Sequence, residues 1–120
     1  MENTINKNYI VYKVTSPDGK IYVGFTSQEL KERWRQHREN ALLQINPERL
    51  FYNEIRRYSG EGFTIEALYT THDKDTAMLL EEECILAVPD ELSLNMTRGG
   101  RYDGTDGSKI FWERIVFFSS

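Results

Sequence analysis

Hydrophobic and polar positions alternate in two short runs near the start of the chain. Residues 9–15 (YIVYKVT) and 20–25 (KIYVGF) are rich in β-branched and aromatic side chains, which favour strands. The turn between them includes Pro17, which favours a type I turn, and Gly19, which can adopt the left-handed conformation that follows it. The pattern predicts a β-hairpin with a three-residue loop.

Apolar residues recur at helical spacing further along the chain. A Thr and a Glu at the spacing of a capping box predict a first helix over residues 26–43, and an Asn-Pro pair predicts a second helix over residues 46–58. Residues 63–71 (FTIEALYTT) are typical of a third strand. Asp73 then predicts the start of a third helix, which ends at Pro89.

The element order ββααβα predicts an α/β fold of the α+β kind, with a small three-stranded antiparallel sheet flanked by helices. Residues 93–100 (SLNMTRGG) predict a short extended piece that runs into a glycine turn. We expect residues 1–100 to form one domain. Residues 101–120 are expected to pack on it as a tail, because the segment 109–118 (KIFWERIVFF) is too apolar for a linker.

The composition is that of one globular domain: 120 residues, with 39% hydrophobic and 28% charged side chains. The single cysteine, Cys84, excludes an internal disulfide and is typical of a reducing compartment, and with two histidines a structural zinc site is not expected. The longest apolar run, residues 84–88, is too short to span a membrane, and residues 1–8 lack the apolar stretch of a secretory signal. These features predict a cytoplasmic protein with no membrane segment.

Charge is divided unevenly along the chain, whose formal net charge is -4. Residues 1–58 hold 10 Lys and Arg against 7 Asp and Glu, a net +3, whereas residues 59–120 hold 5 against 12, a net -7. Domains that bind nucleic acid are usually basic overall. This domain is therefore expected to bind DNA only through a local basic face, or with a metal ion that offsets its acidic half.

The predicted hairpin determines which side chains share a face of the sheet. If residues 16 and 20 pair beside the loop, Tyr12 faces Gly24 and Tyr22 faces Val14. Tyr12 and Tyr22 are then diagonal neighbours on one face, roughly 7–8 Å apart between Cα atoms, with open space beside Gly24. Two phenols over an open spot can form a site, although tyrosines are also simply good strand residues.

Two polar residues of the first helix, Arg33 and His37, lie one turn apart and share a face. They are predicted at the edge of an apolar stripe, where side chains are half-buried, and further basic residues continue their surface. The stripe consists of Leu30, Trp34 and Ala41, and the basic surface of Lys31, Arg35 and Arg38. The simplest interpretation is a solvated charged face with a packed histidine, and the other is a binding site.

One carboxylate interrupts the apolar stripe of the third helix. The stripe consists of Ala77, Leu80, Cys84, Ile85 and Val88. Glu81 falls in its middle, whereas Glu82 and Glu83 are expected to point toward solvent. A carboxylate rarely lies on a buried face unless it is paired or binds a metal. Glu81 is therefore either the partner of Arg33 in an ion pair or a ligand of a divalent cation.

Taken together, these residues resemble the motifs of the GIY-YIG nuclease family, over about residues 8–100. The matching pieces, in chain order, are Ile10-Val11-Tyr12, Tyr22-Val23-Gly24, Arg33 with His37, Glu81, and Leu94-Asn95 followed by Gly99-Gly100. Their order and spacing agree with the family throughout. One departure lies in the first tripeptide, where Ile10-Val11 stands in place of Gly-Ile; this removes some backbone freedom but keeps the tyrosine.

The resemblance implies a metal-dependent DNA endonuclease that hydrolyses phosphodiester bonds with a single divalent cation, Mg²⁺ or Mn²⁺. It implies that Glu81 holds this cation, since one carboxylate with phosphate oxygens and waters suits Mg²⁺. It also implies that Arg33 grips the scissile phosphate and that Tyr12 acts as general base or positions the attacking water.

The remaining family residues are implied to support this centre. Tyr22 and His37 are expected to assist Tyr12 through hydrogen bonds, and Asn95 is expected to brace the backbone near Glu81. We expect both tyrosines, the arginine and the glutamate to converge on one face of the sheet. The basic residues expected to track DNA phosphates are Arg35, Arg38, Arg49, Arg56 and Arg57.

An alternative remains open: a non-catalytic, nuclease-like module that binds nucleic acid or a protein partner. The negative net charge favours it, whereas the intact set of motif residues argues for the enzyme. Relatives that are homing endonucleases carry a separate DNA-binding region after the nuclease domain. Only about 20 residues follow Gly100 in this sequence. A homodimer or a separate specificity partner would then supply the missing DNA contacts.

Overall fold

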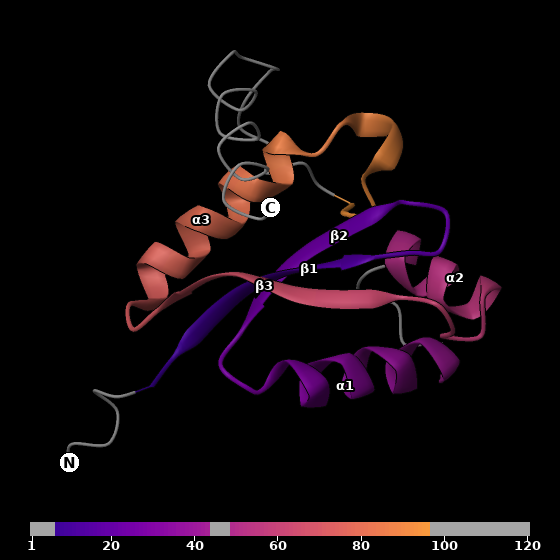
Figure 1. The fold of residues 1–120 in the computed structure, drawn as a ribbon, viewed down its shortest axis with the longest axis horizontal. Helices are drawn as coiled ribbons and strands as arrows, with labels where there is room; N and C mark the ends of the chain where they lie inside the picture. Colours follow the sequence, from indigo (N-terminus) through magenta and orange to yellow (C-terminus); the bar gives the residue numbers. More distant parts are fainter. Residues whose placement is uncertain (1–6, 44–48, 97–120) are drawn as a thin grey trace.

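The structure, a computed structural model, describes residues 7–43 and 49–96 (Figure 1). Three strands and three α-helices follow one another in the predicted order ββααβα. They are β1 (Tyr9–Thr15), β2 (Ile21–Thr26), α1 (Leu30–Leu42), α2 (Arg49–Arg57), β3 (Thr64–Thr71) and α3 (Lys74–Ala87), followed by the short 3-10 helix η2 (Asp90–Leu92). The predicted α+β fold is confirmed. The tail predicted over residues 101–120 lies outside the described residues.

The strands form one antiparallel sheet in the order β2-β1-β3. The hairpin has the predicted register: Tyr12 pairs with Gly24, and Val14 pairs with Tyr22. At the turn, the backbone N–H of Ser16 donates to the carbonyl of Lys20 at 2.8 Å. A right-handed turn followed by one left-handed residue therefore fixes this register, and so the face to which each tyrosine points.

The pairing of β1 with β3 contains an irregularity next to Tyr12. Val11 pairs with Tyr69, whereas Tyr12 pairs with Ala67, so Leu68 is the extra residue of a β-bulge. A bulge increases local twist and changes the direction of the neighbouring side chains. The central strand is thus distorted at Tyr12, which the sequence predicts to be a site residue.

Helices cover both faces of the sheet: α3 lies on one side and α1 on the other (Figure 1). Alternate strand residues supply the two cores. On the α3 side the buried residues are Val11, Ile21, Val23, Ala77, Cys84, Ile85, Ala87 and Val88. On the side of α1 and α2 they are Tyr12, Val14, Tyr22, Ala41, Phe51, Tyr52, Ile55 and Leu94. We call these the α3 face and the α1/α2 face.

The helix starts agree with the sequence in one case and differ in another. Asp73 caps α3 as predicted, since its carboxylate accepts the backbone N–H of Thr76 at 3.0 Å. The capping box predicted at Thr26 is wrong. Thr26 still pairs with Ile10 in the sheet, and α1 begins four residues later, at Leu30. Strand pairing of a buried threonine therefore prevails over the local capping signal. The Asn-Pro start predicted at residues 46–47 lies outside the described residues.

A short extended segment after η2 lies along the outer edge of β2. The sequence predicts an extended piece over residues 93–100, of which residues 97–100 lie outside the described part of the chain. Ser93 forms a parallel bridge with Ile21, and the N–H of Leu94 donates to the carbonyl of Ile21 at 2.8 Å. This contact supplies hydrogen-bond partners to backbone groups of the edge strand β2, which would otherwise have no partner in the sheet. Over residues 7–43 and 49–96, no helix has the length and apolar character needed to cross a membrane.

Candidate active site

Tyr12 lies at the centre of the sheet and points into the α1/α2 face. It is fully buried, and its hydroxyl oxygen lies 2.8 Å from Nε2 of His37. The sequence predicts open space beside Gly24, but the Tyr12 ring fills it. A Cβ atom on Gly24 would lie 2.7 Å from the Tyr12 hydroxyl oxygen and 3.1 Å from Cε2 of Tyr22. Glycine is therefore required opposite Tyr12, because any side chain would displace its hydroxyl.

Tyr22 lies beside Tyr12 on the same face, as predicted, with a distance of 6.4 Å between ring centroids. Its ring stacks in parallel on Phe51 of α2, with centroids 4.0 Å apart and an angle of 4° between the planes. The ring edge also contacts His37, at a centroid distance of 5.5 Å. Aromatic contacts thus hold Tyr22 against the same imidazole that Tyr12 contacts.

His37 is fully buried, and the prediction of a half-buried position at the edge of the stripe is wrong. Residues 30, 34, 37 and 41 recur at one helical face, so His37 lies in the middle of the stripe. Its Nδ1 atom lies 3.0 Å from the Tyr52 hydroxyl. Burial, with a smaller effect from the positive charge of Arg33, lowers the pKa of His37 to about 3. The imidazole is therefore neutral at pH 7.

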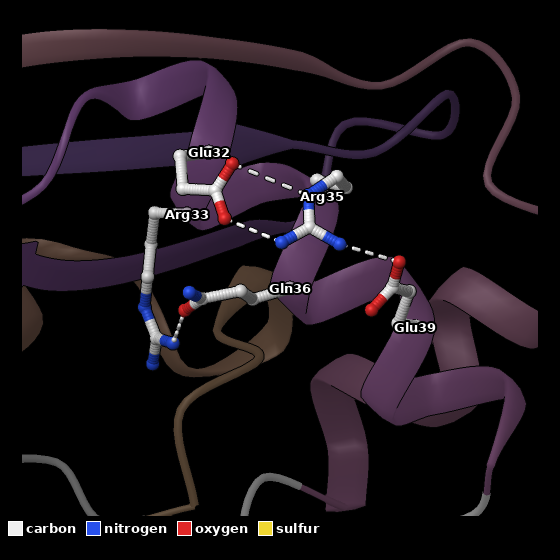
Figure 2. A network of polar contacts seen from close by, with 5 residues as sticks. All are labelled: Glu32, Arg33, Arg35, Gln36 and Glu39. Carbon is white, nitrogen blue, oxygen red and sulfur yellow. Dashed lines mark hydrogen bonds and ion pairs between the residues drawn. The ribbon is translucent and has the colours of Figure 1, made fainter.

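Arg33 is half-buried at the rim of this face, and its Nη1 donates to Oε1 of Gln36 at 2.9 Å. Figure 2 shows its side chain directed away from the neighbouring group in which Arg35 binds Glu32 and Glu39. Arg33 and Arg35, two arginines of one helix, therefore differ in the partners of their guanidinium groups. The guanidinium of Arg35 is held by two carboxylates on the surface, and that of Arg33 contacts a neutral amide.

The charges around Tyr12 oppose one another. Burial raises the pKa of Tyr12 to about 12, although Arg33 acts to lower it through its charge and a hydrogen bond. The negative charge of Glu81 acts in the same direction as burial. Tyr12 is therefore a neutral phenol at pH 7, and both charged residues lie close enough to affect it.

Glu81 reaches this centre from the other side of the sheet. Because α3 packs on the α3 face, Glu81 and the two tyrosines belong to elements that pack on opposite faces of the sheet. Convergence of the four side chains on one face stays a prediction. The predicted contrast between Glu81 and its two neighbours is wrong, since Glu81, Glu82 and Glu83 are all half-buried. In α3, Ala77 is buried near the start, and burial is continuous from Cys84 to Ala87; the three glutamates directly precede this continuous stretch.

The residues present allow a cation at Glu81 but not an enclosed metal cage. Within residues 7–43 and 49–96, no group of three or more His, Cys, Asp or Glu side chains is assembled to bind a metal. A half-buried carboxylate remains accessible to solvent. Mg²⁺ commonly uses one or two protein carboxylates together with waters and phosphate oxygens, and a single glutamate fits that pattern.

Asn95 is tied to the strand that carries the second tyrosine. Its Oδ1 accepts the backbone N–H of Val23 at 3.0 Å, and its Nδ2 donates to the carbonyl of Val23 at 2.9 Å. The side chain therefore acts like one more strand residue beside β2. These bonds fix the β2 backbone between Tyr22 and Gly24. The expected brace of backbone near Glu81 stays a prediction.

Most of the predicted DNA-binding arginines have partners within the protein. Arg56 donates to the carbonyl of Ala41 at 2.6 Å, which satisfies the end of α1. Arg57 lies 3.7 Å from carboxylate oxygens of both Asp18 and Glu54. Arg38 is exposed beside Gly60 at the end of α2. Arg49 begins α2, and its side chain lies outside the described part of the chain.

Two further residues of α2, which the sequence did not predict, contact this centre: Phe51 supports Tyr22, and Tyr52 contacts His37. The available signal is the apolar periodicity of α2, where residues 51, 52 and 55 are buried together. That signal identifies a core position. It does not indicate which polar group a buried hydroxyl contacts on another helix.

Residues 8–88 match the family model described as the GIY-YIG catalytic domain. This range is more than half of the chain and includes every candidate residue except Asn95. Comparison with curated proteins and comparison with solved structures gave no significant match.

Proposed function

The chain belongs to the GIY-YIG nuclease family, and we propose that it is a DNA endonuclease that hydrolyses phosphodiester bonds with a divalent cation. The observation that carries the proposal is the setting of the Tyr12 hydroxyl. It lies 2.8 Å from a neutral, buried imidazole and within the influence of one positive and one negative charge, those of Arg33 and Glu81. A simple core tyrosine needs neither charge.

Arg33 is proposed to bind the scissile phosphate. Its guanidinium is half-buried and contacts the neutral amide of Gln36, so a phosphate can use its planar pair of donors. Partial burial strengthens such a contact because less water competes for it. A bound phosphate would also offset the positive charge of Arg33, which in the free protein lowers the pKa of His37.

Tyr12 is proposed to orient the attacking water and accept its proton. With a pKa of about 12 the phenol is protonated at pH 7, so it can accept one proton only by losing its own. Nε2 of His37, 2.8 Å away, is proposed as the acceptor of that proton in the DNA complex, where bound phosphate offsets the charge of Arg33 that disfavours a protonated imidazole. The water proton then moves to the Tyr12 oxygen, the phenol proton moves to His37, and the remaining hydroxide attacks phosphorus.

Glu81 is the residue that would hold the cation, Mg²⁺ or Mn²⁺. When bound, such an ion supplies charge neutralisation for the phosphate and the leaving oxygen. The position of Glu81 at the end of the well-packed half of α3 supports this assignment, because a firmly held helix keeps the carboxylate in place.

DNA is the proposed partner. Arg38 is exposed, whereas Arg35 and Arg57 would exchange carboxylate partners for phosphates on binding. The net charge of -4 supports a limited DNA contact area, so a homodimer or a separate specificity partner is proposed to extend it. A cytoplasmic location remains a prediction from the single, buried cysteine.

A plasmid-nicking assay tests the proposal. The wild-type protein should convert supercoiled plasmid to nicked or linear DNA in Mg²⁺ and not in EDTA. Glu81→Gln should be inactive in Mg²⁺. Glu82→Gln, which changes a half-buried neighbour on the same helix, should cleave like the wild type. Plasmid binding without cleavage under every metal condition would instead support the non-catalytic module.

A further inference from the structure

Tyr52 of α2 contacts the buried imidazole at its second nitrogen. Its hydroxyl lies 3.0 Å from Nδ1 of His37, whose Nε2 lies 2.8 Å from the Tyr12 hydroxyl. All three side chains are almost fully buried. A continuous chain of hydroxyl, imidazole and hydroxyl therefore runs from α2 through α1 to β1.

A neutral imidazole carries its proton on one nitrogen, so this chain has two possible directions. In the first, Nδ1–H donates to the Tyr52 oxygen, and the bare Nε2 accepts the Tyr12 hydroxyl proton. In the second, the Tyr52 hydroxyl donates to Nδ1, and Nε2–H donates to the Tyr12 oxygen. Only the first leaves Nε2 able to receive a proton from Tyr12.

The surroundings of Tyr12 favour the first direction. Arg33 interacts with the Tyr12 oxygen and can only donate hydrogen bonds. The hydroxyl hydrogen of Tyr12 is therefore best directed away from the guanidinium, and Nε2 of His37 lies at hydrogen-bond distance to receive it. The second direction would place two donors, the guanidinium and Nε2–H, against one phenol oxygen.

We propose that Tyr52 is a positioning residue, which accepts a hydrogen bond from Nδ1–H of His37 and thereby keeps Nε2 free to take the Tyr12 proton. The inference rests on the proposed function for its catalytic consequence, but the tautomer itself does not. Tyr52 touches no substrate in this scheme. It fixes the orientation of the ring and stabilises the Nδ1–H bond as positive charge develops on the imidazole during proton transfer.

The tautomer can be measured directly by ¹⁵N NMR of the wild-type protein at pH 7. The chain has two histidines, and the exposed His72 serves as an internal reference for His37. We expect His37 to be neutral and protonated at Nδ1. A ring protonated at Nε2 in the wild type overturns the proposal, whether or not the protein cleaves DNA, and requires no variant to fold.

Tyr52→Phe then tests the consequence, because it removes only the hydroxyl. The control is Tyr58→Phe, which removes a hydroxyl just beyond α2 from a half-buried ring that packs on Phe63. In Tyr52→Phe we expect the His37 resonances to shift toward the other tautomer or a mixture of both. We also expect the single-turnover rate to fall by roughly 10–100-fold, with KM unchanged and the pH profile displaced. The control should match the wild type in all of these.

Two results separate this inference from the proposed function. An unchanged His37 tautomer in folded Tyr52→Phe overturns the positioning role even if the wild type is an active nuclease. A tautomer that changes in Tyr52→Phe, in a wild-type protein that never cleaves DNA, supports the role of Tyr52 on His37 and refutes the proposed nuclease activity instead.

Discussion

The two faces of the sheet are built from different kinds of side chain. The buried residues of the α3 face, among them Val11, Val23 and Ile85, include no aromatic ring, and its aromatic side chains are only partly buried. The α1/α2 face is aromatic and includes two tyrosine hydroxyls that bracket the imidazole of His37. Both faces are buried, but only the second encloses a chain of polar groups. Buried polar groups cost stability unless each finds a partner, so this chain imposes geometric demands that the α3 face does not.

The comparison separates residues that support the fold from residues that support chemistry. On the α3 face, a change of side-chain volume should alter stability and little else. On the α1/α2 face, a small change should displace a hydroxyl or a proton and alter activity more than stability. Glu81 is the exception, because it comes from the helix of the α3 face yet affects Tyr12. It therefore gives the first and largest test.

Glu81→Ala should abolish cleavage while the fold is kept. If Glu81 serves as a cation ligand, its replacement by alanine removes a charge from a half-buried position, so the free energy of unfolding should stay unchanged or rise. Cleavage in Mg²⁺ and urea denaturation measure the two effects. If Glu81 serves only as the partner of Arg33, the variant will lose stability, and unchanged activity would refute the ligand assignment.

Arg33→Lys should be almost as damaging as Arg33→Ala. Lysine keeps the positive charge but lacks the planar pair of donors that matches a phosphate. Loss of a preorganised donor to the reacting group lowers the rate by roughly 10²–10³-fold, and we expect a value of this order for both variants. Single-turnover rates compare them. A lysine variant that cleaves like the wild type would show that only charge is needed.

Gly24→Ala should separate the two faces most directly. The added methyl group would lie 2.7 Å from the Tyr12 hydroxyl oxygen, so the hydroxyl must move away from His37. Overpacking of this kind costs about 1–3 kcal/mol, and cleavage should fall along with stability. The matched change on the α3 face is Ile85→Val, which should cost about 0.5–1.5 kcal/mol and leave the cleavage rate of folded protein unchanged. Equal losses of cleavage in both variants would contradict the distinction.

Local signals predicted much of the fold. The turn before Lys20 and the alternation of the two strands were enough to give the register that pairs Tyr12 with Gly24. The cap at Asp73 is also predictable from local sequence, because a helix cap contacts a residue only three positions away. Thr26 shows the limit, since its sheet partner is distant in sequence and outweighs the capping pattern around it.

The site was predicted less completely because its contacts are tertiary. The resemblance identified His37, but Tyr52 lies fifteen positions later on another helix, and no local pattern connects the two. The fold implied by the resemblance places Glu81 with the tyrosines on one face, and the stripe pattern defines only the inner side of its helix. It does not define which face of the sheet that helix covers. The path of the chain through β3 determines which face of the sheet α3 covers, and it places α3 opposite α1.

The buried imidazole should make the protein sensitive to acid. His37 has a folded pKa of about 3, below the ordinary value of about 6.5, so the unfolded state binds more protons between these values. The corresponding stability is complete above about pH 6.5 and is lost as the pH falls toward 3. At pH 5 the loss attributable to His37 is about 2 kcal/mol. Urea denaturation of wild type and His37→Gln at pH 7 and pH 5 isolates it, and equal losses in both proteins would contradict the prediction.

The smallest expected effect is on DNA affinity, which depends on neither core. The exposed and surface-paired arginines should reach roughly three to five phosphates, and each adds about -0.9 to the slope of log affinity against log salt. We therefore expect affinity near the non-specific range of about 10⁻⁴–10⁻⁶ M at physiological salt, tightened by divalent metal.

Arg38→Ala should weaken binding modestly, equally for all duplexes, and reduce the salt slope by about 1, because phosphate contacts carry no base information. Arg56→Ala should also weaken binding equally for all duplexes, and in addition lower stability, since it removes the donor to the Ala41 carbonyl at the end of α1.

Salt titrations on several duplexes, in a Glu81→Ala background that prevents cleavage, measure the effect of both variants on DNA affinity. Urea denaturation measures the effect of Arg56→Ala on stability. Nanomolar affinity for one sequence with a shallow slope would instead mean that base contacts dominate, supplied by a second subunit or by residues outside the described ranges. The arginines of α1 and α2 would then only orient a DNA that another surface selects.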